Sequence, residues 1–239
     1  MDPINPFTTT IATPTAARPL LGLTVLVVED SRFACEAMRL LCLSSGARIR
    51  RADCLRSARR HLQVYRPTVV IADLGLPDGS GLDLIAELAD SQPAVEVILA
   101  TSGDSSLAGA ARAAGAHGFM PKPVTAIAEF QETILALLPA ERRPNGPRVM
   151  TNETIAPDQI AYRDDMAHIA DMLEIPPDER ALDYVAQFLS GVAHAADDTL
   201  MEQAARSLAL RRAQGQPTGS QTAAIAGMIQ QRLAHKIAI

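Results

Sequence analysis

The chain lacks several features that would place it in a membrane or outside the cell. It contains no run of about 18 apolar residues, the length needed to cross a bilayer. Its first residues, MDPINPFTTT, do not form a basic segment followed by an apolar one, so they predict no secretion signal. Only three of the 239 residues are cysteines. Their number is odd and their spacing is not that of a metal site, so we interpret them as core or flanking residues and expect a cytoplasmic protein.

The net negative charge of the chain comes entirely from its C-terminal part. The formal net charge is -5, yet residues 1–150 carry 15 basic and 15 acidic side chains, whereas residues 151–239 carry 7 basic and 12 acidic ones. An acidic domain repels a phosphate backbone. We therefore do not expect nucleic acid to be a partner.

Apolar patterns in the N-terminal half alternate between strand and helix. Continuous β-branched or apolar runs predict strands, and apolar residues at i, i+3, i+4 and i+7 predict the helices between them. The predicted strands are 23–28, 48–52, 68–73, 95–100 and 119–120, and the predicted helices are 34–41, 57–65, 82–89, 107–114 and 125–138. Five such alternations imply a doubly wound α/β fold, with a parallel five-stranded sheet covered by helices on both faces.

Composition divides the chain into four segments. Residues 1–19 are rich in Thr, Pro and Ala and predict a flexible leader, which the α/β domain follows at 20–140. The stretch 141–157 contains ERRPNGPRVMTNETIAP and predicts an exposed linker. Beyond it, 158–239 shows only helical periodicity, with four amphipathic segments that predict a small all-α bundle.

Polar side chains follow the ends of four predicted strands. In an open parallel sheet, ligands bind at the carboxyl ends of the strands. The residues found there are Glu29, Asp30, Asp73, Thr101, Ser102 and Lys122. Three crowded carboxylates repel one another, and a hard divalent cation such as Mg²⁺ relieves that repulsion. The hydroxyl and the ammonium group suit a phosphoryl group beside the metal.

These motifs resemble the receiver domain of two-component response regulators, a flavodoxin-like (βα)5 family phosphorylated by histidine kinases. The resemblance covers roughly residues 21 to 140 and rests on VLVVEDS, VVIADLGLPDGSGLDL, ILATSGD and GAHGFMPKPV, in that order. It implies that Asp73 is the phosphoacceptor. It further implies that Mg²⁺ is held by Glu29, Asp30, Asp73 and the backbone carbonyl of Gly75.

The same resemblance assigns a switch. Thr101 and Lys122 would bind the phosphoryl oxygens, and Phe119 would be the aromatic residue that rotates inward on activation. The resemblance also implies a cis peptide between Lys122 and Pro123. The expected donor is a histidine kinase or a histidine phosphotransfer protein, and a regulator of this kind is a switch rather than an enzyme.

Three outputs are open for residues 158–239. We favour protein interaction, with an unknown downstream target, or formation of a homodimer, because the helices are amphipathic and the segment is acidic. DNA binding is the first alternative. It would require one exposed basic face, made of Arg206, Arg211, Arg212, Arg232 and Lys236. An enzymatic output is the second alternative, and no sequence motif supports it.

Histidines in the helical segment raise the question of a phosphotransfer domain. His168, His194 and His235 lack the nearby Lys and Gly expected around a phosphorylated histidine in that family. We therefore interpret them as ordinary core or surface residues.

Overall fold

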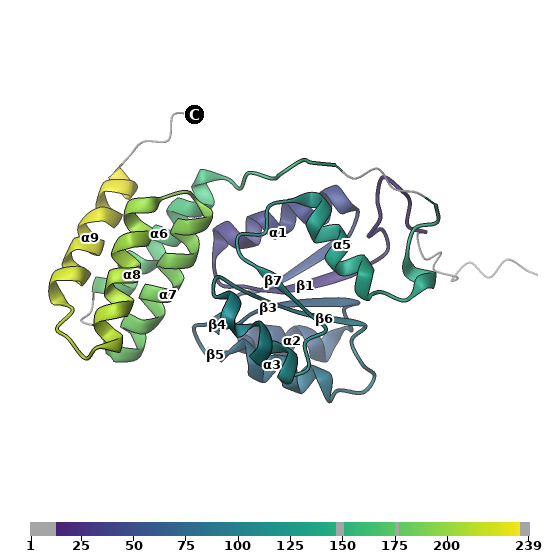
Figure 1. The fold of residues 1–239 in the computed structure, drawn as a ribbon, viewed down its shortest axis with the longest axis horizontal. Coiled ribbons are helices and arrows are strands. Elements are labelled where there is room, and N and C mark those ends of the chain that lie inside the picture. Colours follow the sequence, from purple (N-terminus) through teal and green to yellow (C-terminus); the bar gives the residue numbers. More distant parts are fainter. Residues whose placement is uncertain (1–12, 147–150, 175–176, 235–239) are drawn as a thin grey trace, which may run out of the picture.

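The computed structural model describes residues 13–146, 151–174 and 177–234. They form an α/β domain and, beside it, a bundle of four helices (Figure 1). No helix in these described ranges is both long enough and apolar enough to cross a membrane.

The α/β domain is built on a parallel sheet with the strand order β2-β1-β3-β6-β7. Its strands are β1 (Thr24–Val28), β2 (Arg48–Ala52), β3 (Val69–Asp73), β6 (Val97–Ser102) and β7 (Gly118–Pro121). Its helices are α1 (Arg32–Ser45), α2 (Leu55–Val64), α3 (Gly81–Ala89), α4 (Ala108–Ala113) and α5 (Ile127–Leu137), with short 3₁₀ turns η1 (Ser105–Leu107) and η2 (Ala140–Arg142). The predicted doubly wound α/β class is confirmed.

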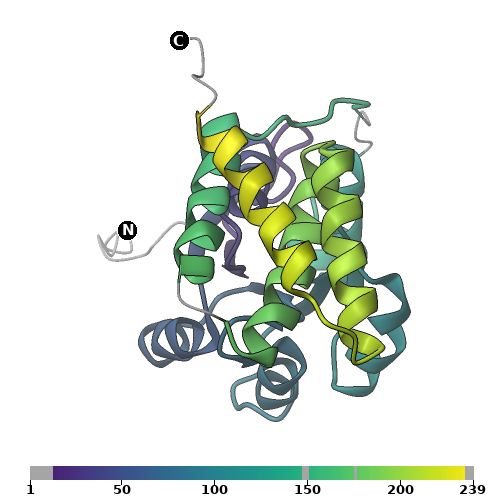
Figure 2. The same ribbon diagram turned by 90° about the vertical axis from the view of Figure 1, so that its left-hand side faces the viewer.

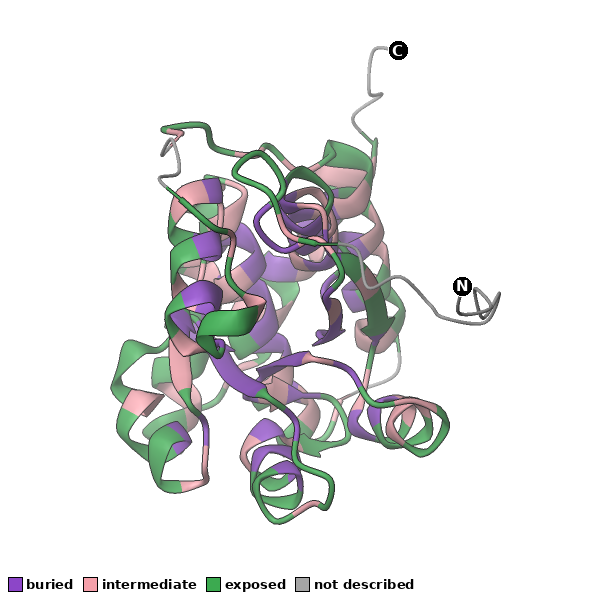
Figure 3. Ribbon diagram, turned by 90° about the vertical axis from the view of Figure 1, so that its right-hand side faces the viewer, coloured by how far each residue is buried: buried purple, intermediate pink, exposed green. Residues whose placement is uncertain are grey.

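Two hydrophobic cores explain why the strands are apolar along their whole length. On one face of the sheet, Val25 and Val27 pack with α1 and α5 around Phe130. On the other face, Leu26 and Val28 pack against α2, α3 and α4. Successive side chains of a strand point to opposite faces, so a strand covered on both sides needs an uninterrupted apolar run. Figure 3 shows buried positions along the central strands and on the helix faces turned toward them.

A small hairpin after β3 was not predicted from the sequence. The two-residue strands β4 (Gly75–Leu76) and β5 (Gly79–Ser80) pair antiparallel and lead directly into α3. Their closeness to β3 depends on Gly81, because a Cβ at that position would lie 2.0 Å from the carbonyl oxygen of Asp73. The hairpin therefore turns the chain sharply at the end of the strand that carries Asp73.

The four predicted C-terminal helices are all present. They are α6 (Gln159–Glu174), α7 (Glu179–Ala195), α8 (Thr199–Ala213) and α9 (Gly219–Ala234), which we call the helical bundle. Asp178 caps α7 and Asp198 caps α8, since their carboxylates accept N–H groups of the first turns. In Figure 2 the bundle lies in front of the α/β domain.

Part of the segment predicted as an exposed linker packs on the α/β domain. Thr154 forms a β-bridge with Ala126, and the N–H of Ile155 donates to the carbonyl of Thr125 at 2.9 Å. Ile155 is half-buried against the first core because its apolar side chain gains by leaving water. The division at 141–157 stays a prediction, and so does the leader at 1–19, of which residues 1–12 lie outside the described ranges.

Candidate functional site

The fold brings the predicted carboxylates together at one edge of the sheet. Glu29 and Asp30 follow β1, and Asp73 ends the adjacent strand β3. Oxygen atoms of the three side chains lie within 4.8 Å of one another. The strand order reverses its direction between β1 and β3, and such a switch point is where doubly wound sheets bind ligands.

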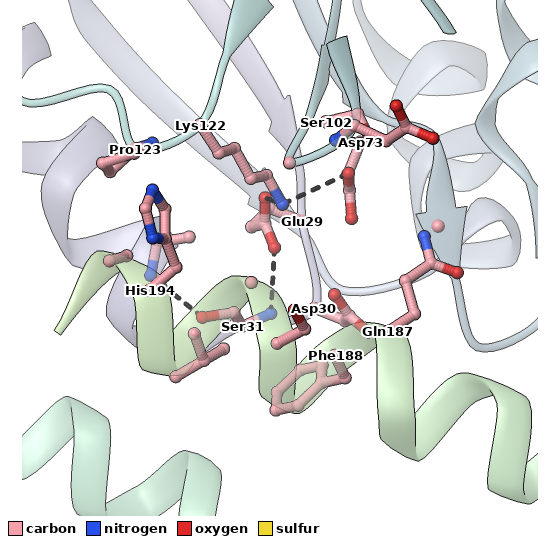
Figure 4. A pocket seen from close by; sticks show the side chains of 18 of the residues that line it. Glu29, Asp30, Ser31, Asp73, Ser102, Lys122, Pro123, Gln187, Phe188 and His194 are labelled. Carbon is pink, nitrogen blue, oxygen red and sulfur yellow. Dashed lines mark hydrogen bonds and ion pairs between the residues drawn. The ribbon is translucent and has the colours of Figure 1, made fainter. Parts of the chain in front are cut away.

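Lys122 lies between two of these carboxylates (Figure 4). Its ammonium nitrogen is 2.6 Å from Oε2 of Glu29 and 3.2 Å from Oδ1 of Asp73. Burial by itself would lower the pKa of Lys122, but Asp73 and Glu29 outweigh burial and raise it, so the side chain is a cation. Lys122 is joined to Pro123 by a cis peptide, as the resemblance implied.

The carboxylates carry more negative charge than Lys122 can balance. Burial raises the pKa of Glu29 well above its ordinary value and that of Asp30 to about 6. For both groups the charge of Asp73 adds to the increase, although Lys122 opposes it. Three oxygen donors in this state fit a small divalent cation, which would replace the missing positive charge.

Two residues of the predicted switch also lie at this edge. Thr101 pairs with Asp73 in the register of the sheet and is 1% exposed. Its hydroxyl is buried and has no hydrogen-bond partner in the described part of the chain, so it is available to a ligand. Phe119 is half-buried and packs against the second core.

The remaining predicted groups stand close by. Gly75, in β4, lines the same cavity as the carboxylates. Ser102, at the end of β6, accepts the N–H of Asp104 at 3.1 Å and thereby shapes the loop that follows.

The helical bundle contributes residues that the sequence analysis missed. The hydroxyl of Tyr184, in α7, donates to Oδ2 of Asp30 at 2.6 Å. Asp165, in α6, is 1% exposed and accepts from the hydroxyl of Ser31 at 2.7 Å and from the N–H groups of Arg32 at 2.7 Å and Phe33 at 3.1 Å. Tyr184 and Asp165 occupy positions typical of any amphipathic helix, so no local signal marks them.

A cavity of about 840 Å³, the interdomain cavity, separates the sheet edge from helices α7 and α8. One wall comes from the α/β domain and includes Glu29, Asp73 and Lys122, and the facing wall includes Gln187 and His194 of α7. Figure 4 shows these side chains around the same space. A ligand that reaches Asp73 in this arrangement therefore meets both parts of the molecule.

His168 and His194 of the helical bundle have different surroundings. His168 packs edge-on against Phe188, with ring centroids 6.0 Å apart. His194 is half-exposed, and its Nδ1 lies 3.2 Å from Glu202. His235 lies outside the described residues.

Comparison with known families identifies the α/β domain. Residues 25–134 match the model of the response regulator receiver domain. The chain therefore contains the receiver domain of two-component response regulators, and the α/β domain is called the receiver domain below. Helices α6 to α9 lie beyond the matched residues.

Among similar proteins are transcriptional regulators. KdpE, the KDP operon transcriptional regulatory protein of Escherichia coli K12, is 31% identical over 114 residues, which are 48% of this chain and 50% of that protein. The probable transcriptional regulatory protein TcrX of Mycobacterium tuberculosis H37Rv is 33% identical over 123 residues, 50% of each protein. The chain spans about half the length of these relatives.

Among solved structures, a putative response regulator from Chloroflexus aurantiacus J-10-fl is similar to the chain with 25% identity and a TM-score of 0.45, covering 48% of this chain and 96% of that one. We expected that nucleic acid is not a partner. The names of KdpE and TcrX, which are transcriptional regulatory proteins, do not support that expectation.

Proposed function

We propose that this protein is a phosphorylation-dependent switch in which Asp73 accepts a phosphoryl group from the phosphohistidine of a histidine kinase or phosphotransfer protein. The observation that carries the proposal is the position of Asp73. Its carboxylate lies within 4.8 Å of Glu29 and Asp30, contacts Lys122, and lines the interdomain cavity.

In the proposed transfer, a carboxylate oxygen of Asp73 forms a bond to phosphorus while the bond from phosphorus to the donor's imidazole nitrogen breaks. The electron pair of the broken bond stays on the imidazole. Lys122, which contacts Asp73, binds the phosphoryl oxygens, and Thr101 can donate its unused hydroxyl to one of them. A Mg²⁺ ion held by Glu29, Asp30, Asp73 and the Gly75 carbonyl would balance the charge on those oxygens.

The proposed switch converts this chemistry into a change of packing. A hydrogen bond from Thr101 to the phosphoryl group draws the threonine side chain inward, and Phe119 moves into the space it leaves. Two alternative packings of one core are a bistable element that a phosphoryl group can bias. The helical bundle is the part that responds, because α6 and α7 contact the residues that follow β1.

For the output we propose protein interaction or dimerisation of the helical bundle, without an enzymatic activity. Three of the four arginines on which a DNA-binding face would depend are engaged with acidic groups, whereas Arg211 donates to the carbonyl of Pro217 at 3.5 Å. Arg206 pairs with Glu202 at 2.5 Å, Arg212 pairs with Asp183 at 2.9 Å, and Arg232 pairs with Asp198. Lys236 lies outside the described residues.

The experiment for the acceptor compares the native chain with Asp73→Asn in Mg²⁺ and a small phosphodonor. We expect the native chain to gain the mass of one phosphoryl group and the variant to gain none, because an amide is not a nucleophile toward phosphorus. Asp83→Asn, an exposed carboxylate in the first turn of α3, is the control and should be labelled like the native chain. Labelling of Asp73→Asn at the native rate would refute the proposed acceptor.

The experiment for the output measures oligomeric state by light scattering with and without a beryllofluoride mimic of the phosphoryl group. A change from monomer to dimer that is absent in Asp73→Asn supports the homodimer. Binding of the activated chain to random duplex DNA that weakens steeply with salt would instead favour the transcriptional alternative.

A further inference from the structure

One side chain of the helical bundle is hydrogen-bonded to a carboxylate of the candidate metal site. Tyr184 stands on α7, 154 positions after Asp30 in the sequence, and its hydroxyl donates to Oδ2 of Asp30 at 2.6 Å. Phe188, one turn further along α7, packs beside Tyr184 with ring centroids 5.6 Å apart. The tyrosine ring is therefore supported from within the bundle.

A second contact fixes the turn that follows Asp30. The buried carboxylate of Asp165 accepts one hydroxyl and two backbone N–H groups from Ser31, Arg32 and Phe33. These groups open α1, and the beginning of a helix favours a negative charge. Phe33 itself is 3% exposed and belongs to the core of the bundle, where its ring meets Tyr162 edge-on at 5.9 Å. The bundle thus holds both Asp30 and the turn that follows it in place.

Asp30 differs from its two neighbours in its partners. Glu29 and Asp73 each pair with Lys122, whereas no ion pair to Asp30 is found within the described ranges. Its side-chain hydrogen-bond partner is the neutral hydroxyl of Tyr184, which donates to one of the two carboxylate oxygens. A half-buried carboxylate without an ion pair gains from a cation, because its charge is only partly compensated.

We propose that Tyr184 is a positioning residue for the divalent cation: by holding Oδ2 of Asp30 it orients the carboxylate so that Oδ1 can serve as a ligand. Hydrogen bonds of this kind orient metal ligands and commonly change metal affinity by about 10 to 100-fold. The inference rests on the proposed function, since it assumes that Glu29, Asp30 and Asp73 hold the metal.

A linkage follows from this assignment. Among the described residues, the bundle offers Asp30 the neutral hydroxyl of Tyr184 and no ion pair, so docking without metal leaves that charge poorly compensated. A divalent cation removes this cost, and docking of the bundle orients a ligand for the cation. Metal binding and bundle docking then strengthen each other by the same factor, as any two coupled binding equilibria must.

The test is a calorimetric titration of Mg²⁺ into the full native chain, Tyr184→Phe and Tyr162→Phe. The phenylalanine at 184 keeps the ring and removes only the hydroxyl, and we expect Mg²⁺ to bind about tenfold or more weakly. Tyr162→Phe is the matched control, because the Tyr162 hydroxyl donates to Asp198 at 2.6 Å and does not contact the metal site. It should bind Mg²⁺ like the native chain. Equal or tighter Mg²⁺ binding by Tyr184→Phe overturns the proposal, and tighter binding would mean that the bundle competes with the metal.

Hydrogen exchange provides a second readout that does not depend on phosphorylation. The N–H groups of Arg32 and Phe33 donate to Asp165. We expect Mg²⁺ to slow hydrogen exchange of these two amides in the native chain, and to slow it less in Tyr184→Phe. Asp165→Asn, which weakens the contact between the bundle and the turn after Asp30, should also reduce Mg²⁺ affinity, and native affinity in this variant would contradict the linkage. If the native chain binds no Mg²⁺, the proposed metal site fails as well. If the native chain binds Mg²⁺ and is labelled on Asp73 while Tyr184→Phe binds Mg²⁺ normally, only the role of Tyr184 is refuted.

Discussion

The receiver domain and the helical bundle differ in how they complete their hydrophobic cores. Both cores of the receiver domain are made of its own strands and helices, and the first core also includes Leu20 before β1 and Ile155 after α5. The core of the bundle includes Phe33, which belongs to α1 of the receiver domain. A residue of the receiver domain is therefore part of the hydrophobic core of the bundle. A movement of α1 would change the packing of that core directly.

Asp30 of the receiver domain and Asp198 of the bundle have pKa values that are shifted in opposite directions. In the receiver domain, burial raises the pKa of Asp30 and of Glu29, and Lys122 opposes this only in part. In the bundle, burial likewise acts to raise the pKa of Asp198, but hydrogen bonds from Arg232 and Tyr162 outweigh it and the pKa is lowered. A carboxylate matched with a cation stabilises a fold, whereas unmatched carboxylates are typical of a site that awaits a ligand.

The largest expected effect tests the shared core. Phe33→Ala should lower the free energy of unfolding by about 3 to 5 kcal/mol, because a fully buried ring is removed. The loss should appear in the bundle, whose amides should exchange faster, while the sheet stays protected. Phe130→Ala, at a 0% exposed position in the first core, is the control and should weaken the sheet. Urea unfolding and hydrogen exchange measure both, and equal loss of protection in the two regions of Phe33→Ala would contradict the comparison.

A smaller effect is expected from the matched carboxylate of the bundle. Asp198 accepts from Arg232 and from the hydroxyl of Tyr162, so Asp198→Asn should cost about 1 to 2 kcal/mol near neutral pH. Because the folded pKa of Asp198 is lowered, its contribution is present above the ordinary pKa of about 3.9 and is lost as the pH falls through the folded pKa. The melting temperatures of variant and native chain should therefore converge below about pH 4. A difference that persists unchanged in acid would show that the charge of Asp198 is not responsible.

The smallest effect is expected on the surface of the receiver domain. Arg59 in α2 and Glu87 in α3 form an ion pair at 2.6 Å, with side chains that are 44% and 50% exposed. Arg59→Gln should change the free energy of unfolding by less than about 1 kcal/mol, since solvent screens an exposed pair. Added salt should reduce even this difference. A cost as large as that of Phe33→Ala would mean that surface charge, and not the shared core, distinguishes the two regions.

Much of the receiver domain could be predicted because its sequence patterns are local. The continuous apolar runs of β1, β3 and β6 and the periodicity of α1 each depend on neighbouring residues alone. The hairpin of β4 and β5 was missed because two-residue strands have no pattern of their own. The packing of Ile155, in the segment predicted as a linker, likewise has no local pattern, since it depends on a core formed by distant residues.

The sequence by itself determined which side chains of the receiver domain meet. Parallel strands end at a common edge, so Glu29, Asp30, Asp73, Thr101 and Lys122 had to converge once the strands were assigned. Only the tertiary structure decided that Tyr184 and Asp165 join them. Those contacts join residues more than 130 positions apart and depend on how the two domains pack against each other. Helical periodicity predicts which residues share a face of a helix, but it does not predict which other element that face will contact.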